Sequence, residues 1–214
     1  MAVHESPDDD WLVRGDGDPR EVADHYDAWA ESYDADLDAW SYQAPGVVAG
    51  LLLARQPASG TILDVGCGTG LAGRALRAGG YRGRLVGLDI STASLRLAEE
   101  SGAYDELRPT DLTQPLPLAD DAVDAVVCVG VMTYLPEVEA VWREFARVVR
   151  PPGHVVLTQR EDLWEPRRCQ EVVDRLASEG VWSPVDVHGP AAYLPESTGD
   201  LADLGAYYLT ASVS

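Results

Sequence analysis

Short apolar runs alternate with amphipathic helical segments along most of this chain. The apolar runs of strand length lie at residues 61–65, 85–88, 107–110, 123–131 and 154–159. The segments with helical periodicity lie at residues 71–78, 91–100, 137–149 and 165–179. Strands separated by helices predict a parallel sheet, because each helix carries the chain back to the edge where the previous strand began.

Two further helices are predicted before this alternation, and two strand-like segments follow it. Helical patterns cover residues 21–37 and 45–55, and β-like patterns cover residues 181–187 and 207–213. A stretch with Pro and Gly at 189–199 separates the two β-like segments. These segments therefore predict an antiparallel edge on a sheet that is otherwise parallel.

The length of 214 residues is sufficient for one α/β domain with a large core and too short for a second one. We expect an acidic, mobile arm at residues 1–18 and a single domain at residues 19–214. No stretch reaches the roughly 20 apolar residues of a membrane span, and the first residues are acidic where a signal peptide is basic. The sequence therefore predicts a cytoplasmic protein that does not insert into a membrane.

The charge and the reactive side chains exclude several classes of function. The net charge is −20, and residues 5–38 hold thirteen acidic residues against two arginines. Such a surface repels a nucleic-acid backbone, so no nucleic-acid partner is expected. Cys67, Cys128 and Cys169 form no C-x-x-C pair, the four histidines are scattered, and no metal site is predicted. All sixteen cationic residues are arginine, which excludes chemistry through a lysine Schiff base.

A glycine-rich turn follows the first predicted strand. Asp64 is followed by Gly66, Gly68 and Gly70, and Asp89 closes the next strand, nineteen residues after the last glycine. Glycines allow the sharp turn, and the second strand carries Asp89 to the same edge of the sheet, where a carboxylate can bind two ribose hydroxyls. The spacing differs from the dinucleotide fingerprint G-x-G-x-x-G. It favours a nucleoside without phosphates, and we therefore predict an adenosyl cofactor.

These residues, in this order, resemble the first motif of the class I S-adenosylmethionine-dependent methyltransferases. The resemblance implies an α/β, Rossmann-like fold: a mostly parallel seven-stranded sheet with an antiparallel edge hairpin and an N-terminal helical lid at residues 19–57. It implies that Asp89 holds the cofactor ribose, that Ile90 contacts the adenine face and that Asp111 accepts from the adenine amino group. The backbone amide of Leu112 would bind a ring nitrogen. For Asp111 the alternative is a structural cap of a turn.

Two further segments match the family. Residues 124–132, which include Cys128, resemble the fourth-strand motif, whose carboxyl end faces both cofactor and acceptor. Residues 26–34 resemble the Y-D-x-x-A-x-x-Y-D element, which closes over the cofactor as a lid. An aromatic face near a sulfonium contributes about 0.5 to 2 kcal/mol, so Tyr26 and Tyr33 are predicted to bind it. Alternatively, these rings share one helix face because they pack on the core.

A general base cannot be transferred from the family. Many relatives carry a histidine shortly after the fourth strand, where this chain has Thr133, Tyr134 and Leu135. If the acceptor is an amine or a hydroxyl, a nearby side chain could take its proton. The candidate catalytic residues are Tyr26, Tyr134, Glu161 and His188, with His25 as a further candidate. Each of them, taken alone, is more often a surface or packing residue.

Residues 158–164 and 193–195 resemble a bacterial subgroup of small-molecule methyltransferases related to the methyltransferase-like proteins of the Williams-Beuren region. The resemblance implies S-adenosylmethionine as cofactor and a small metabolite as partner, methylated at nitrogen, oxygen or carbon, in secondary metabolism. One alternative is a cyclase or lyase of the same fold that releases methylthioadenosine from the cofactor. Another is a binder without catalytic activity. Whether the chain is a monomer or a homodimer stays open.

Overall fold

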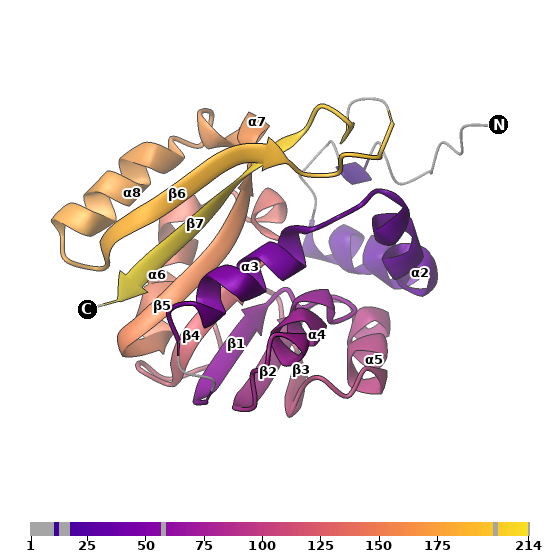
Figure 1. Ribbon diagram of the computed structural model, residues 1–214, viewed down its shortest axis with the longest axis horizontal. Coiled ribbons are helices and arrows are strands. Elements are labelled where there is room, and N and C mark those ends of the chain that lie inside the picture. The colour runs from indigo at the N-terminus through magenta and orange to yellow at the C-terminus, as the bar shows by residue number, and fades with distance from the viewer. Residues whose placement is uncertain (1–10, 13–17, 57–58, 199–200, 214) are drawn as a thin grey trace.

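The computed structural model describes residues 11–12, 18–56, 59–198 and 201–213, arranged around a seven-stranded sheet (Figure 1). Most of the predicted acidic arm, residues 1–10 and 13–17, lies outside the described residues. The strands are β1 (Thr61–Val65), β2 (Arg84–Asp89), β3 (Glu106–Pro109), β4 (Val123–Cys128), β5 (Val149–Arg160), β6 (Ser183–Ala192) and β7 (Gly205–Val213). The helices are α2 (Pro19–Ala39), α3 (Ala44–Leu53), α4 (Leu71–Ala78), α5 (Thr92–Glu100), α6 (Val138–Val148), α7 (Glu161–Trp164) and α8 (Cys169–Ser178), with a 3₁₀ turn, η1, at Met132–Tyr134.

The strand order is β3-β2-β1-β4-β5-β7-β6. The first five strands are parallel to their neighbours, whereas β7 runs antiparallel to both β5 and β6. This arrangement confirms the predicted Rossmann-like sheet with its antiparallel edge. The order reverses between β1 and β4, and the adjacent carboxyl ends of parallel strands at such a point are where open α/β sheets bind ligands.

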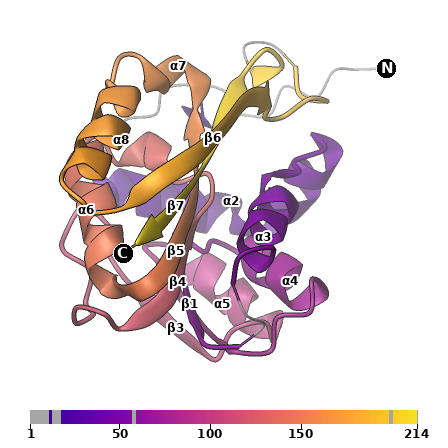
Figure 2. The ribbon, with the colours of Figure 1, turned by 60° about the vertical axis from the view of Figure 1, so that its left-hand side comes forward.

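Both faces of the sheet are covered, which explains why its central strands β1 and β4 are mostly apolar and show no regular polar alternation. Figure 2 shows α3 and α4 on one side of the sheet and α6 and α8 on the other. In β4, Ala125 and Val127 belong to the core beneath α3, whereas Val126 and Cys128 belong to the core beneath α6 and α8. Successive side chains of a strand point to opposite faces, so a strand buried on both sides has no polar alternation.

The largest differences in element ends between prediction and structure concern β4, β5, β6 and the helix after β5. β4 stops at Cys128 because Gly130, with φ +78°, turns the chain, and its amide donates to the Thr158 hydroxyl over 2.9 Å. The predicted helix at 165–179 begins only at Cys169, after Pro166 and Arg168, and Arg168 has φ +52°. Proline lacks an amide donor and a positive φ is not helical, so a continuous helix is excluded there. Strand β5 begins earlier than predicted, with Val149 paired to Val123 of β4, and β6 extends to Ala192 because it pairs with β7 as far as Gly205.

Helix α2 lies beyond the carboxyl ends of the strands and beside α5 (Figure 1). The Asp18 side chain caps its first turn by accepting from the Arg20 amide over 2.9 Å, as expected for a helix N-terminus. Its buried residues, Trp29 and Leu37 among them, face the rest of the protein. Within the described part of the chain, no helix is long and apolar enough to cross a membrane.

Candidate active site

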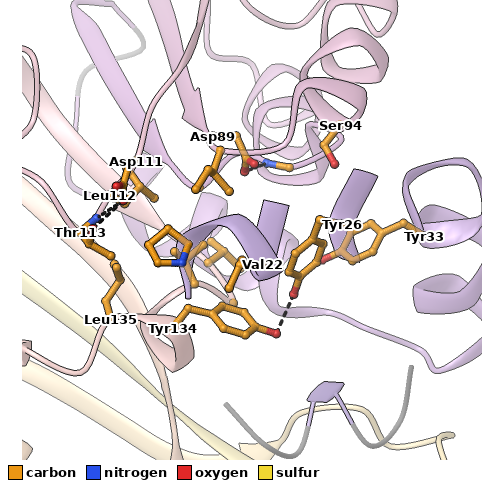
Figure 3. Close-up of a pocket in the computed structure, with 17 residues that line it drawn as sticks. Val22, Tyr26, Tyr33, Asp89, Ser94, Asp111, Leu112, Thr113, Tyr134 and Leu135 are labelled. Carbon is orange, nitrogen blue, oxygen red and sulfur yellow. Dashed lines mark hydrogen bonds between the residues drawn. The ribbon is translucent and has the colours of Figure 1, made fainter. Parts of the chain in front are cut away.

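The carboxyl ends of β1, β2 and β4 border a cavity of about 740 Å³, counting the space at its mouth. We call it the donor cavity. Figure 3 shows Asp89 and Asp111 along one side of it and Tyr26 and Tyr134 opposite. Of the residues predicted from the sequence, the cavity is lined by Tyr26, Tyr33, Gly66, Gly68, Asp89, Ile90, Asp111, Leu112 and Tyr134. Segments from five parts of the chain therefore meet at this one edge.

The glycine turn after β1 forms the floor between the cavity and the sheet. Gly66 has φ +73°, and a β-carbon there would overlap the side chain of Val131. Gly68 has φ +52°, and a β-carbon there would stand in open space. Glycine at position 66 is therefore required for both backbone conformation and packing. At position 68 it leaves room at the cavity wall.

Asp89 is fixed against this turn by its own hydrogen bonds. Its Oδ2 accepts from the Gly68 amide over 2.7 Å, and its Oδ1 accepts from the Ser91 amide over 2.8 Å. Burial raises the pKa of Asp89, while the backbone donors at Ser91 and Gly68 oppose that shift. Two amide donors favour an ionised carboxyl group, so the site presents a rigid acceptor where β2 ends.

The opposite end of the cavity is formed by the segment after β3. Asp111 accepts from the Thr113 amide over 2.9 Å and from the Thr113 hydroxyl over 2.7 Å, both through Oδ1. The structural cap considered from the sequence is therefore present. Ile90 and Leu112 also line this end, so it combines apolar surface with a carboxylate.

Three tyrosines close the side of the cavity that faces α2. The hydroxyls of Tyr26 and Tyr134 are hydrogen-bonded at 3.0 Å, and the ring of Tyr26 meets the rings of Tyr33 and Tyr134 edge to face at 5.9 and 5.8 Å. Burial raises the pKa of all three, well above the ordinary value for Tyr26 and Tyr33. They are therefore neutral phenols at physiological pH and can donate a hydrogen bond.

The aspartates that follow two of these tyrosines attach α2 to the rest of the site. Asp27 accepts from the Ser91 hydroxyl over 2.6 Å and from the Ala93 amide over 3.0 Å, at the start of α5. Asp34 accepts from the Thr69 hydroxyl and pairs with Arg74, both at 2.5 Å. Sequence reasoning assigned no role to these aspartates. The signal was present in the repeated Tyr-Asp pairs, which place the rings on one helix face and the carboxylates beside it.

Asp64 lies beneath the turn and borders a smaller cavity next to the donor cavity. Its Oδ2 accepts from the Tyr104 hydroxyl over 2.6 Å, whereas its Oδ1 is buried and has no hydrogen-bond partner among the described residues. Burial raises its pKa to about 7, with the Tyr104 bond opposing this shift and the charge of Asp89 adding to it. A buried carboxylate oxygen without a partner is costly, which makes it a candidate binding group.

The remaining predicted residues lie outside the donor cavity. Gly70 is the N-cap of α4, and Cys128 is fully buried in the core beneath α6. Glu161 is exposed at the start of α7, and His188 is exposed on β6 opposite Tyr208. His25 stacks on Trp11 with ring centroids 4.5 Å apart. Among the described residues, no group of three or more His, Cys, Asp or Glu side chains is arranged to hold a metal ion.

Comparison with known proteins gives concordant matches. A family model described as a methyltransferase domain matches residues 63–157. The chain is 35% identical over 192 residues to human methyltransferase-like protein 27, which covers 80% of this chain and 75% of that protein. It is 33% identical over 104 residues to the ubiquinone biosynthesis O-methyltransferase of Cupriavidus pinatubonensis, covering 45% of this chain and 40% of that relative.

Among solved structures, the magnesium protoporphyrin IX methyltransferase of Synechocystis PCC 6803, which was solved with bound S-adenosylhomocysteine, superposes with a TM-score of 0.64. The identity is 18%, and the match covers 92% of this chain and all of the other. This likeness concerns the fold, whereas the human relative shows kinship in sequence. The chain therefore belongs to the class I S-adenosylmethionine-dependent methyltransferases.

Proposed function

We propose that this enzyme transfers the methyl group of S-adenosylmethionine to a nitrogen, oxygen or carbon atom of a small metabolite. The observation that carries the proposal is the donor cavity itself, where Asp89 is hydrogen-bonded to the glycine turn at 2.7 Å and three partly buried tyrosines line the same space. This arrangement combines a fixed carboxylate for ribose hydroxyls with an aromatic wall for a cation.

The residues present fit an adenosyl group. Asp89 would accept from the two ribose hydroxyls, and Ile90 and Leu112 would pack on the adenine face. Asp111 would accept from the adenine amino group through its second oxygen, because its Oδ1 already serves Thr113. The open space at Gly68 leaves room for a ligand against the turn. When bound, S-adenosylmethionine supplies an electrophilic methyl group on a positively charged sulfur.

Asp64 extends this site toward the amino-acid end of the cofactor. Its buried Oδ1 lacks a partner, and the smaller cavity that it borders shares Gly66, Gly68 and Tyr33 with the donor cavity. An ammonium group placed there would satisfy that oxygen and favour the ionised carboxylate. We therefore assign the cofactor's ammonium group to Asp64.

The tyrosines act by alignment and exclusion of water. Methyl transfer is an in-line displacement, in which the acceptor's lone pair bonds to the methyl carbon while the electrons of the carbon–sulfur bond return to sulfur. Tyr26 and Tyr33 cover the sulfonium side of the cavity, and Tyr134 holds Tyr26 in place through their hydroxyls. The raised pKa values of Tyr26 and Tyr134 disfavour a role as general base at neutral pH.

Two observations favour a small acceptor. The net charge of −20 opposes a nucleic-acid substrate. Relatives include an O-methyltransferase of ubiquinone biosynthesis, and a structural neighbour is a methyltransferase of magnesium protoporphyrin IX. We do not assign Glu161 and His188 to catalysis in this proposal, because both lie outside the donor cavity.

The proposal is tested by product analysis. The purified enzyme is incubated with S-adenosylmethionine and a panel of small amines, phenols, carboxylic acids and activated carbon acids, and products are followed by mass spectrometry. Acceptor-dependent S-adenosylhomocysteine, in equal amount to a methylated acceptor, is the expected result. Methylthioadenosine without S-adenosylhomocysteine would contradict methyl transfer and support the cyclase or lyase alternative. The Asp89→Ala variant serves as the control, because it is expected to bind the cofactor more weakly and to form less product at a limiting cofactor concentration.

A further inference from the structure

One tyrosine reaches the carboxyl group of Asp64 from a distant part of the chain. Tyr104 lies between α5 and β3, and its hydroxyl donates to Asp64 Oδ2 over 2.6 Å. The same hydroxyl oxygen accepts from the Gly73 amide, in the first turn of α4, over 3.1 Å. An amide can only donate, and a tyrosine hydroxyl has a single proton. The Gly73 bond therefore directs the hydroxyl proton of Tyr104 at Asp64.

The ring of Tyr104 lies in a space that glycines leave open. A β-carbon on Gly73 would stand 2.4 Å from the hydroxyl oxygen of Tyr104. A β-carbon on Gly70 would stand 3.0 Å from its ring, and one on Gly87 would stand 3.1 Å from it. Gly73 lies inside a helix, where glycine has a low intrinsic propensity. The packing of Tyr104 explains this glycine, and the close fit fixes the position of the hydroxyl.

This contact gives the two oxygens of Asp64 different roles. Oδ2 is occupied by Tyr104, whereas Oδ1 is buried and has no hydrogen-bond partner among the described residues. The smaller cavity that Asp64 borders has room for a group of the size of a water molecule. An ammonium group has that size. Tyr104 thus engages one oxygen and leaves the other for a small donor.

The surroundings of Asp64 favour a donor that carries a positive charge. Among the described residues, the ionisable groups that interact with it are Tyr104 before β3, Asp89 at the end of β2, Cys67 in the glycine turn and Cys128 in β4. None of these groups is cationic. Burial raises the pKa of Tyr104 and of both thiols, so they are neutral at physiological pH.

Two of these groups act on Asp64 in opposite directions. Burial raises the pKa of Asp64 to about 7, the hydrogen bond from Tyr104 opposes this shift, and the charge of Asp89 adds to it. A hydrogen bond to the ionised form of a carboxyl group favours that form. Tyr104 is therefore the side chain that prepares Asp64 to receive a cation.

We propose that Tyr104 is a positioning residue that makes the site selective for adenosyl ligands with a free amino group. It holds Asp64 through Oδ2 and keeps the carboxyl group ready to bind an ammonium group through Oδ1. Where Asp64 is protonated before binding, its proton passes to solvent as the ammonium group takes its place. The inference rests on the proposed function, since it requires the amino-acid end of the cofactor beside Asp64. It adds a residue that lines neither the donor cavity nor the smaller cavity.

The test compares two ligands by calorimetry on the full chain. One is S-adenosylhomocysteine, and the other is its deamino analogue, which keeps the carboxylate and lacks the amino group. The wild type is expected to prefer S-adenosylhomocysteine by about tenfold or more at pH 7, because the charged donor bonds to a carboxylate. Wild-type protein that does not bind S-adenosylhomocysteine refutes the proposed function. Equal affinity for the two ligands overturns this inference alone.

Proton release gives a second measurement, from titrations in buffers of different ionisation enthalpy. With the pKa of Asp64 at about 7, binding of S-adenosylhomocysteine should release close to one proton at pH 6, about half a proton at pH 7 and very little at pH 8. The deamino analogue should release almost none at any of these pH values. Equal release with both ligands contradicts the inference.

Tyr104→Phe keeps the ring and removes the hydroxyl. Ionised Asp64 then loses a donor and its pKa rises further, so S-adenosylhomocysteine should bind about fivefold more weakly at pH 7 and should still release protons at pH 8. Affinity for the deamino analogue should change by less than about twofold. An unchanged affinity ratio of the two ligands, or no proton release at pH 8, overturns the inference.

Tyr81→Phe is the matched control. Tyr81 is a buried tyrosine after α4, and its hydroxyl donates to the Gly60 carbonyl over 2.8 Å, away from Asp64. This variant also loses a hydroxyl but should keep the wild-type ligand ratio and proton release. If Tyr104→Phe fails to fold, 3-fluorotyrosine in place of Tyr104 decides. Its hydroxyl is a stronger donor, so proton release at pH 7 should be smaller than in the wild type. Unchanged or larger release there overturns the inference.

Discussion

The donor cavity shares Tyr26, Tyr33, Gly130 and Tyr134 with an adjoining cavity, which we call the inner chamber, but the two cavities are built differently. The donor cavity is formed mostly by residues at or just after the ends of four parallel strands, β1 to β4. Its carboxylates, Asp89 and Asp111, each accept from backbone amides nearby in the sequence or in the adjacent turn. The inner chamber is assembled from residues as distant as Leu12, Arg160 and Leu204. A site made from local turns is recognisable as a motif, whereas a site made from long-range contacts carries no such pattern.

The largest expected effect tests whether the donor cavity depends on its glycine turn. Gly66→Ala adds a β-carbon that overlaps Val131 at a residue with φ +73°, whereas Gly102→Ala meets nothing at the similar φ of +66°. Both variants are expected to lose about 1 to 2 kcal/mol from backbone strain. Only Gly66→Ala should lose a further 1 to 3 kcal/mol or so from overpacking. Urea unfolding measures the difference, and equal losses would show that Val131 adapts without cost.

The next effect concerns affinity for the donor. Asp89→Ala is expected to weaken S-adenosylmethionine binding by about 1 to 3 kcal/mol, because the ribose hydroxyls lose their acceptor. Asp24→Ala is the matched control, since Asp24 is an exposed carboxylate on α2 that does not line the cavity. Calorimetry compares the two variants with the wild type. Unchanged affinity in Asp89→Ala would refute the assignment of this residue to the ribose.

The third prediction uses pH to probe the cofactor's amino-acid end. The pKa of Asp64 is raised from 3.8 to about 7. At a pH between these two values, Asp64 therefore still carries a proton in the folded chain but has lost it in the unfolded chain. Its contribution to the free energy of unfolding therefore falls as pH rises from about 4 to about 7. A cofactor ammonium favours the ionised form, so affinity should rise by up to about tenfold between pH 6 and pH 8.

Asp64→Asn removes the titrating group and is the control for this prediction. The variant should unfold at a higher temperature than the wild type at pH 8, with a smaller gain at pH 5. Its affinity for S-adenosylmethionine should be nearly constant between these pH values. A wild-type affinity that does not change with pH would place the ammonium group away from Asp64.

The smallest expected effect concerns the helix that covers both cavities. Asp34→Ala removes the acceptor of Thr69 and the partner of Arg74. These side chains are partly exposed, so we expect α2 to pack on the glycine turn about 1 kcal/mol less strongly and S-adenosylhomocysteine to be released about fivefold faster. Stopped-flow fluorescence measures the release, with Asp38→Ala, an exposed residue of α2, as control. Equal rates in both variants would show that α2 does not limit release.

The order of elements and many of the residues that line the donor cavity could be predicted from the sequence because the information is local. Strand periodicity identified β1, β2 and β4, and the glycine spacing predicted the turn after β1. Element ends were less predictable. The division of the helix after β5 depends on the unusual φ of Arg168, and the length of β6 depends on pairing with β7. Propensity does not report such tertiary constraints.

The candidate site shows the same limit. The sequence placed Tyr26 and Tyr33 on one helix face, and the structure puts both at the donor cavity. The sequence also suggested Tyr134, Glu161 and His188 as candidate proton acceptors. Of these three residues, only Tyr134 lines the donor cavity. The repeated Tyr-Asp pairs marked Asp27 and Asp34, but the local pattern did not indicate their partners or Arg160, because these contacts join residues more than 30 positions apart.

The sequence by itself determined the class of fold, the family and the cofactor, because a strand, a glycine turn and a carboxylate at fixed spacing constrain the backbone locally. Only the tertiary structure decided which side chains meet across the strand ends. It brought α2 against the glycine turn, left Asp64 Oδ1 without a partner and buried Arg160 at the inner chamber. Burial and charge pairing depend on residues distant in the chain, so they are set by packing of the whole domain.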